Sequence, residues 1–160
     1  QALRQAISNL VAMRETEGSN IYGDFIKRAD LIAEKLAVIE ERSPQVVEEY
    51  QIRLSDRINE LLAKHNQVIE PERLLQEVAI FADRTSITEE IVRLKSHIKQ
   101  FRLIIDADQP VGRKLDFLIQ EFNREANTIA SKANDYTLAQ VVVEIKAEIE
   151  KIREQIQNIE

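Results

Sequence analysis

Apolar residues recur every three or four positions along most of the chain, which predicts amphipathic helices rather than strands. The first helix is expected over residues 1–16, with Gly18 as its stop. A second is expected over residues 21–42. Pro44 can open a new helix with Ser43 as its cap or kink one long helix, and we favour two segments nearly in line. The apolar positions that define these segments are Leu3, Ile7, Leu10, Met13, Ile21, Phe25, Ala29, Ile32, Leu36, Ile39, Val47, Tyr50, Leu54, Ile58 and Leu61.

The second half of the chain shows the same periodicity in shorter segments. Residues 65–67 break the pattern, and Pro71 opens a helix that ends near Ser86. Ser86 and Glu89 have the spacing of a capping box for a helix that runs to Ile105. Its apolar positions are Ile87, Ile91, Leu94, Ile98, Phe101 and Ile105.

The last predicted helix has the most regular apolar pattern. Asp135 is its expected cap. Its seam is Leu138, Val142, Ile145, Ile149, Ile152, Ile156 and Ile159. This heptad spacing is typical of coiled-coil-like packing and requires a partner, either the helix 87–105 running antiparallel or an equivalent helix of another subunit.

These patterns predict an all-α protein, an elongated helical bundle built from helical hairpins with coiled-coil-like heptad packing. We expect two parts. Residues 1–69 would form long linking or oligomerisation helices, and residues 70–160 a C-terminal helical domain.

Residues 110–136 differ from the rest in their polar content. A helix there, opened by Pro110, has an apolar stripe on one side and a band of amides and basic groups on the other. Asn is a poor helix former, and the amides and guanidinium groups suit RNA phosphates and base edges. A solvated face or a polar network buried between helices would give the same pattern. The candidate RNA-binding residues are Arg113, Lys114, Gln120, Asn123, Arg124, Asn127 and Lys132.

Composition narrows the possible environments and partners. No segment is apolar enough to span a membrane, and the absence of Cys excludes thiolate sites and fits a cytoplasmic protein. The net charge of −6 argues against a broad nucleic-acid surface. Residues 86–105 are nevertheless locally basic, and could face either RNA or solvent.

The motifs of several common catalytic sites, including the P-loop, HExxH and GxSxG, are absent. Glu121 and Glu125, four residues apart, are candidate ligands of Mg²⁺ or Mn²⁺, although Lys114 or Arg124 could pair with Glu121 instead. Glu144 and Glu148 repeat this spacing. No small-molecule cofactor is expected.

His97, between two lysines, is a candidate general acid or base, or else a packing residue. His65 is given no role.

Four runs of sequence resemble the C-terminal region of the YicC-like (YicC/YloC) endoribonuclease family. They are MRETEG (13–18), RLLQEVAIFADRTSITEEIVRLKSHIKQF (73–101), GRKLDFLIQEFNREANTIASKAND (112–135) and VVVEIKAEIEKIREQIQNIE (141–160). Phe122 and Ala130 depart slightly from the family pattern without removing a chemical group. Members of this family have a further domain before this region, so we expect the chain to be a fragment.

The resemblance implies a divalent-metal-dependent endoribonuclease that acts on single-stranded or structured RNA as a cytoplasmic homo-oligomer. We expect His97, Glu121 and Glu125 to form the catalytic centre, with the two glutamates holding the metal. A structural alternative is that this region only oligomerises or clamps, with catalysis in the further N-terminal domain. A helical adaptor that binds another protein is a third possibility.

Overall fold

The computed structural model describes residues 1–63, 70–107 and 111–157. Within these ranges it is all-α, without a strand, as predicted. The helices are α1 (Ala2–Ala63), α2 (Pro71–Thr85), α3 (Thr88–Ile105), α4 (Gly112–Lys132) and α5 (Tyr136–Ile156). The predicted break at residues 65–67, the helix opening at Pro110 and the seam position Ile159 lie outside the described residues.

The predicted stop at Gly18 and the favoured division at Ser43-Pro44 were wrong, because α1 is a single helix that passes through Gly18 and Pro44. Glycine inside a helix costs only about 1 kcal/mol relative to alanine, which a long helix can absorb. Pro44 removes one backbone hydrogen bond from the helix. The apolar stripe from Phe25 to Val46 is nevertheless buried both before and after Pro44. Burial of a continuous apolar stripe therefore outweighs both local signals.

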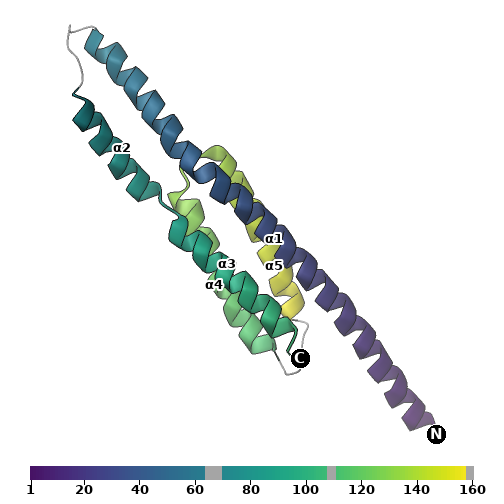
Figure 1. Cartoon of the computed structure of the whole chain (residues 1–160). Coiled ribbons are helices and arrows are strands. Elements are labelled where there is room, and N and C mark those ends of the chain that lie inside the picture. Colours follow the sequence, from purple (N-terminus) through teal and green to yellow (C-terminus); the bar gives the residue numbers. More distant parts are fainter. Residues whose placement is uncertain (64–69, 108–110, 158–160) are drawn as a thin grey trace.

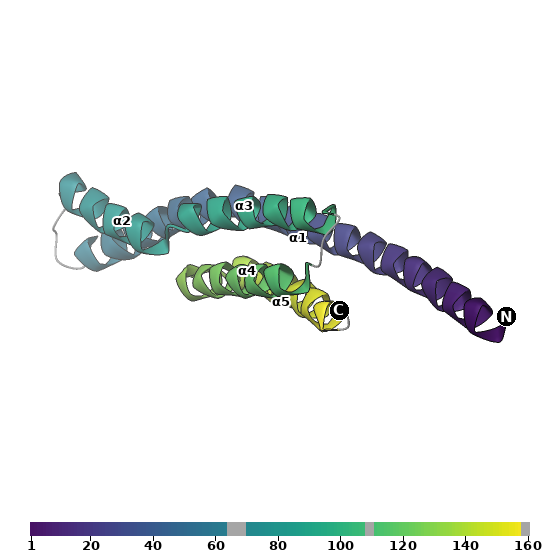
Figure 2. The same ribbon diagram turned by 90° about the horizontal axis from the view of Figure 1, so that it is seen from below.

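Helices α1, α3, α4 and α5 form a four-helix bundle, in which they occupy the corners of a square in cross-section (Figures 1 and 2). α1 packs against α3 and α5, and α4 packs against the same two helices. Each neighbouring pair runs antiparallel. The expectation that α5 would pair with the helix 87–105 was therefore wrong, since α3 and α5 are diagonal and the α5 seam is buried against α1 and α4.

The core lies along the axis of this square and takes side chains from α1, α3, α4 and α5. Phe101 and Phe122 are fully buried at its centre, with ring centroids 5.9 Å apart. Phe25 meets Phe101 edge to face at 5.5 Å. Side chains from both of the expected parts, residues 1–69 and 70–160, thus share one core.

Two segments of α1 extend beyond the bundle (Figure 1). The N-terminal residues 1–20 project from the bundle and are exposed throughout, including their apolar positions Leu3, Ile7, Leu10 and Met13. At the other end α1 and α2 form a two-helix arm, in which the rings of Tyr50 and Phe81 stack at 3.7 Å. No helix in the described part of the chain is both long and apolar enough to cross a membrane.

The two predicted caps had different outcomes. Asp135 caps α5 as predicted, because its carboxylate accepts a hydrogen bond of 2.9 Å from the backbone N–H of Leu138. The capping box of Ser86 and Glu89 is not formed, since Ile87 holds the cap position of α3 and no side chain caps that end. Ile87 immediately precedes the first residue of α3, and its side chain is buried in the core.

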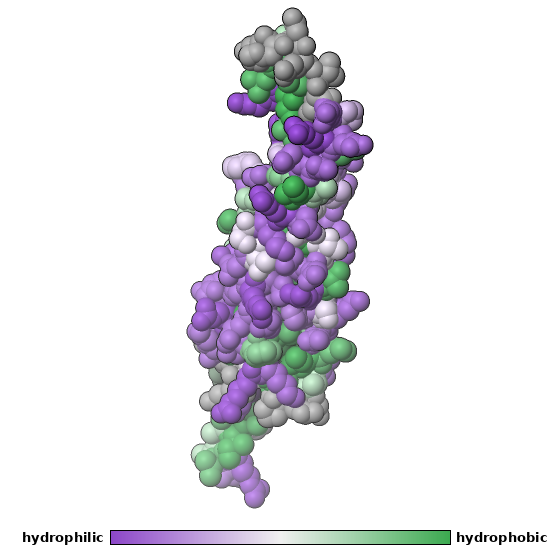
Figure 3. Space-filling model, turned by 90° about the vertical axis from the view of Figure 1, so that its left-hand side faces the viewer, coloured by the Kyte–Doolittle hydropathy of each residue, from purple (hydrophilic) through white to green (hydrophobic). Residues whose placement is uncertain are grey.

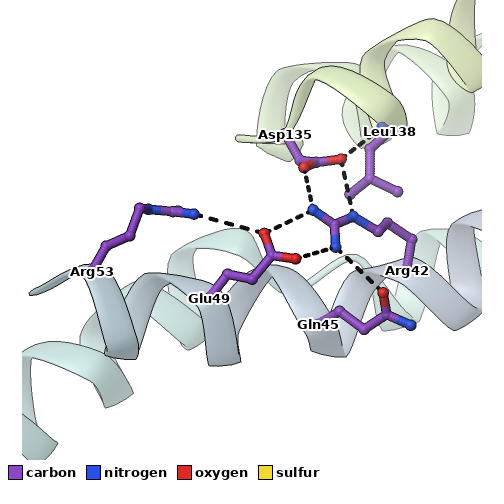
Figure 4. A network of polar contacts seen from close by, with 6 residues as sticks. All are labelled: Arg42, Gln45, Glu49, Arg53, Asp135 and Leu138. Atoms are coloured by element: carbon purple, nitrogen blue, oxygen red, sulfur yellow. Dashed lines mark hydrogen bonds and ion pairs between the residues drawn. The ribbon is translucent and has the colours of Figure 1, made fainter.

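A polar network ties α1 to the start of α5 (Figure 4). The guanidinium of Arg42 donates to the Asp135 carboxylate at 2.7 Å and to Glu49, beyond Pro44, at 2.5 and 2.9 Å. The pKa of Asp135 lies below its usual value, chiefly because of the hydrogen bond from Arg42 and further because of the backbone N–H of Leu138. Asp135 therefore joins a helix cap to an inter-helix ion pair.

We expect Asp135→Asn to lower the free energy of unfolding at pH 7 by about 1–2 kcal/mol, because asparagine retains the cap but loses the charged pair. A carboxyl group with a depressed pKa stabilises the fold above its unfolded pKa, and this contribution disappears as the pH falls through the folded pKa. The difference between the two proteins should therefore shrink below about pH 4 in urea unfolding curves. Asp135→Ala should cost about 1 kcal/mol more through the lost cap, and an equal difference at pH 7 and pH 3 would contradict this account.

Candidate functional site

The three predicted catalytic residues come together between α3 and α4. One potential ligand atom from each of His97, Glu121 and Glu125 lies within 4.8 Å of the other two. α3 supplies the histidine, and α4 supplies both carboxylates from successive turns of one face. The antiparallel packing of α3 on α4 therefore completes a cluster that neither helix contains alone.

Burial increases from Glu121 to Glu125. The Glu121 side chain is 25% exposed and lies 3.6 Å from Arg124, so the ion pair considered from the sequence does form. Glu125 is 3% exposed. Within the described residues its ion-pair partner is Arg93 of α3, at 3.9 Å.

The other buried glutamates have closer partners. Lys132 lies 3.0 Å from Glu90, and Arg28 and Lys151 lie 2.8 and 2.6 Å from Glu148. The pKa of Glu148 is lowered, first by its hydrogen bond with Lys151 and then by that with Arg28. Since a buried carboxylate is costly unless it is paired, Glu125 is the member of this group whose charge is least compensated.

His97 also has unused binding capacity. Its ring is half-buried, and its Nδ1 atom is buried without a hydrogen-bond partner. The ring lies 6.3 Å from that of Phe122, so the aromatic core limits where it can move. An imidazole with an orphaned nitrogen, in one cluster with an under-compensated carboxylate, fits a bound cation, because imidazole nitrogens and carboxylate oxygens are both metal ligands.

A groove lies over this cluster, which we call the α3–α4 groove. It has a volume of about 400 Å³, within the range of ligand pockets. Its lining residues are His97, Gln100, Ile104, Arg113, Lys114, Phe117, Leu118 and Glu121. Arg113 and Lys114 are exposed and have no ion-pair partner among the described residues.

The predicted band of amides and basic groups divides between two sides of α4. Arg113 and Lys114 line the α3–α4 groove, whereas the amides line a second, α4–α5 groove of about 490 Å³. The residues of the α4–α5 groove are Ile119, Gln120, Asn123, Arg124, Asn127, Thr128 and Arg153. Gln120 and Asn127 are exposed and Asn123 is half-buried, so the helices do not seal the band between them.

Lys132 is not part of either groove. Its ammonium group donates to Glu90 at 3.0 Å and to the carbonyl oxygen of Ser86 at 3.1 Å. It joins the end of α4 to the start of α3, so its charge is already used inside the protein.

Three residues of the site were not predicted from the sequence, and one of them is Arg153 of the α4–α5 groove. Arg93 faces Glu125 across the helix pair, a relation that no spacing along the chain reveals. Phe117 lines the α3–α4 groove and is 64% exposed. It stands off the apolar stripe of α4, and an aromatic residue off the stripe was a signal available in the sequence.

Comparison with known proteins shows close relatives. Residues 39–160 match the family model described as "Endoribonuclease YicC-like, C-terminal". The whole chain is 52% identical over 160 residues to a protein of Clostridioides difficile (strain 630) named "Probable endoribonuclease YicC". A protein of Haemophilus influenzae with the same name is 37% identical over 159 residues, 99% of the chain. The chain spans about half (54%) of the length of each relative.

We expect Glu125→Gln to raise the free energy of unfolding in the presence of a chelator by on the order of 1 kcal/mol, because a neutral amide avoids burying a poorly paired charge. The matched control is Glu90→Gln, which should lower it by about 1 kcal/mol through loss of the Lys132 ion pair. Chemical denaturation measures both. A loss of stability in Glu125→Gln as large as that in Glu90→Gln would show that the Glu125 charge is already satisfied within the protein.

Proposed function

The chain belongs to the YicC-like endoribonuclease family, and from that premise we propose that its α3–α4 groove is the RNA-cleaving site of a divalent-metal-dependent endoribonuclease. The observation that carries the proposal is the cluster of His97, Glu121 and Glu125, in which the ion-pair partner of the buried Glu125, among the described residues, is Arg93 at 3.9 Å. The exposed basic pair Arg113 and Lys114, which lines the same groove, supplies the complementary surface for a polyanion.

The cluster would hold the metal through one imidazole nitrogen and two carboxylate oxygens. Mg²⁺ favours sites made of oxygen alone, whereas Mn²⁺ accepts both oxygen and imidazole ligands, so this donor set favours Mn²⁺. We assign His97 to the metal rather than to proton transfer, because its ring nitrogen lies inside the cluster. When bound, such an ion supplies Lewis acidity toward a phosphate and makes a water molecule more acidic.

The protein's own groups orient the RNA. The fork of Arg113 can hold two phosphate oxygens at once, and Lys114 adds a second, compact charge on the same side of α4. Their two positive charges balance the carboxylates of Glu121 and Glu125, so a divalent cation would leave the groove positive. A chain with a net charge of −6 can thereby offer a local site for a polyanion.

The α4–α5 groove would contact the neighbouring nucleotides. Gln120, Asn123 and Asn127 each present an amide that can donate to and accept from a ribose or a base edge. Arg124 and Arg153 in the same groove would add contacts to phosphates. In this arrangement RNA crosses α4 from one groove to the other.

One observation favours the structural alternative, in which this region only assembles subunits. The first turns of α1 project from the bundle with Leu3, Ile7, Leu10 and Met13 exposed, as a helix does when it packs against another chain. Assembly through this segment is compatible with cleavage in the α3–α4 groove, and we propose that the protein is a homo-oligomer. The experiments below separate the two roles.

Replacing Glu121 and Glu125 together by Gln in the intact protein should reduce RNA cleavage by at least about 100-fold, because both carboxylate ligands lose their charge. Calorimetric titration with Mn²⁺ should show binding to the wild type and none to the variant. Cleavage is followed on a labelled RNA in Mn²⁺, with circular dichroism to confirm folding.

The double variant Glu144→Gln/Glu148→Gln is the matched control. These glutamates have the same spacing on α5, but Glu144 pairs with Lys35 and Glu148 with Arg28 and Lys151. It should keep its Mn²⁺ binding and its cleavage once its lower stability is taken into account. Full cleavage by the Glu121/Glu125 variant would instead assign this region to assembly alone.

Replacing Arg113 and Lys114 together by Gln should weaken RNA binding and make it less sensitive to salt. Each phosphate contact of a single strand contributes about 0.7 to the slope of log affinity against log salt, so the slope should fall by about 1.4. The control is Arg84→Gln/Lys146→Gln, which removes the same charge from exposed positions elsewhere. Equal slopes in the two variants would refute a specific role for the groove pair.

A further inference from the structure

Phe117 is an exposed aromatic residue in a protein that otherwise buries its phenylalanines. Of the five in the chain, Phe25, Phe101 and Phe122 are in the core and Phe81 is half-buried against Tyr50. Phe117 is 64% exposed, stands off the apolar stripe of α4 and lines the α3–α4 groove. Core packing therefore does not account for it.

The surroundings of Phe117 are charged and asymmetric. Arg113 lies one turn before it on the same face of α4, and Glu121 lies one turn after it, each about 5–6 Å away along the helix surface. Lys114 completes the basic side. The ring thus stands between a cationic pair, which has no ion-pair partner in the part of the chain that the structure describes, and a carboxylate of the proposed metal cluster.

The apolar surface around Phe117 is small. Ile104 and Leu118 line it beside the ring. On the face drawn in Figure 3, apolar side chains gather at the end of the bundle where α3 leads to α4, while the middle of that face is hydrophilic. Cores of protein–protein interfaces are depleted of charged residues, whereas this small patch is flanked by Arg113, Lys114 and Glu121.

A flat aromatic surface beside free cations matches the chemistry of unpaired nucleotides. Single-stranded nucleic acids bind through bases stacked on aromatic rings and phosphates held by basic residues. In a duplex the same base faces are stacked inside the helix and cannot reach a side chain. One stacked base strengthens binding by roughly 5- to 150-fold.

We propose that Phe117 is a stacking platform for an unpaired base, and that it makes the α3–α4 groove selective for single-stranded RNA. The base rests on the ring while Arg113 and Lys114 hold the adjoining phosphate, which directs the chain toward Glu121. Phe117 is a positioning residue in this arrangement, since it touches a base and not the reacting atoms. The inference rests on the proposed function and adds its substrate class.

The test compares Phe117→Ala, Phe117→Trp and a matched control, Leu103→Ala, in the intact protein. Leu103 is an apolar residue of similar exposure, 71% against 64%, near the end of α3, and it is not among the lining residues of the groove. The probe is a short single-stranded RNA carrying one 2-aminopurine, and the same RNA annealed to its complement. Binding and fluorescence quenching are measured in EDTA, so that the readout does not depend on metal-supported cleavage.

Phe117→Ala should weaken binding of the single strand by roughly 5- to 150-fold and abolish the quenching, with no change toward the duplex. Phe117→Trp should retain both, because tryptophan offers a larger stacking face, and Leu103→Ala should behave as the wild type. Wild-type binding by Phe117→Ala, equal losses toward both RNAs, or an equal loss in Leu103→Ala would overturn the proposal. So would a change in sedimentation of Phe117→Ala, since the ring would then be a subunit contact.

The outcome for the wild type separates this inference from the function on which it rests. A wild-type protein that neither binds nor cuts RNA would refute the proposed nuclease site itself. A wild-type protein that cuts RNA in Mn²⁺ while Phe117→Ala binds the single strand normally would refute only the stacking role.

Discussion

A carboxylate that is buried must be paired with a positive charge or become protonated, and this constraint determines the polar contacts inside the bundle. Glu148 satisfies it through ion pairs with Arg28 and Lys151, and Glu90 through an ion pair of one of its two oxygens with Lys132, while its other oxygen is buried without a hydrogen-bond partner. Glu125 does so poorly, with Arg93 at 3.9 Å and Glu121 close by. A bound cation would compensate the charge of Glu125 in place of a side chain of the protein. The proposed function follows from this difference between Glu125 and the other buried glutamates.

The square packing of the helices decides where that unmet charge lies. Glu125 occupies the face of α4 that contacts α3, and α3 presents His97 at the same level. Phe101 and Phe122 hold these two helices together immediately beside the cluster. The apolar core and the polar site are thus built by one interface, so that movement of α3 relative to α4 would alter both.

Helical periodicity determined much of this protein from the sequence alone, because the period of a helix is set by neighbouring residues. The apolar stripes of the bundle are buried as the spacing predicted, and Asp135 caps α5. The same geometry placed Glu121 and Glu125 on one face. Local signals failed where burial opposed them, since α1 continues through Gly18 and Pro44 while its stripe packs on the bundle.

Only the tertiary structure decided which polar groups remain available. Glu121 and Glu125 have the spacing of Glu144 and Glu148, yet the latter pair is taken up by cations of α1 that lie 109 and 120 positions away in the sequence. Lys132 is likewise engaged by a partner 42 positions earlier. Spacing along a helix specifies the face on which a side chain lies, whereas its partner depends on which helix covers that face, and that choice is made by the packing of the whole bundle.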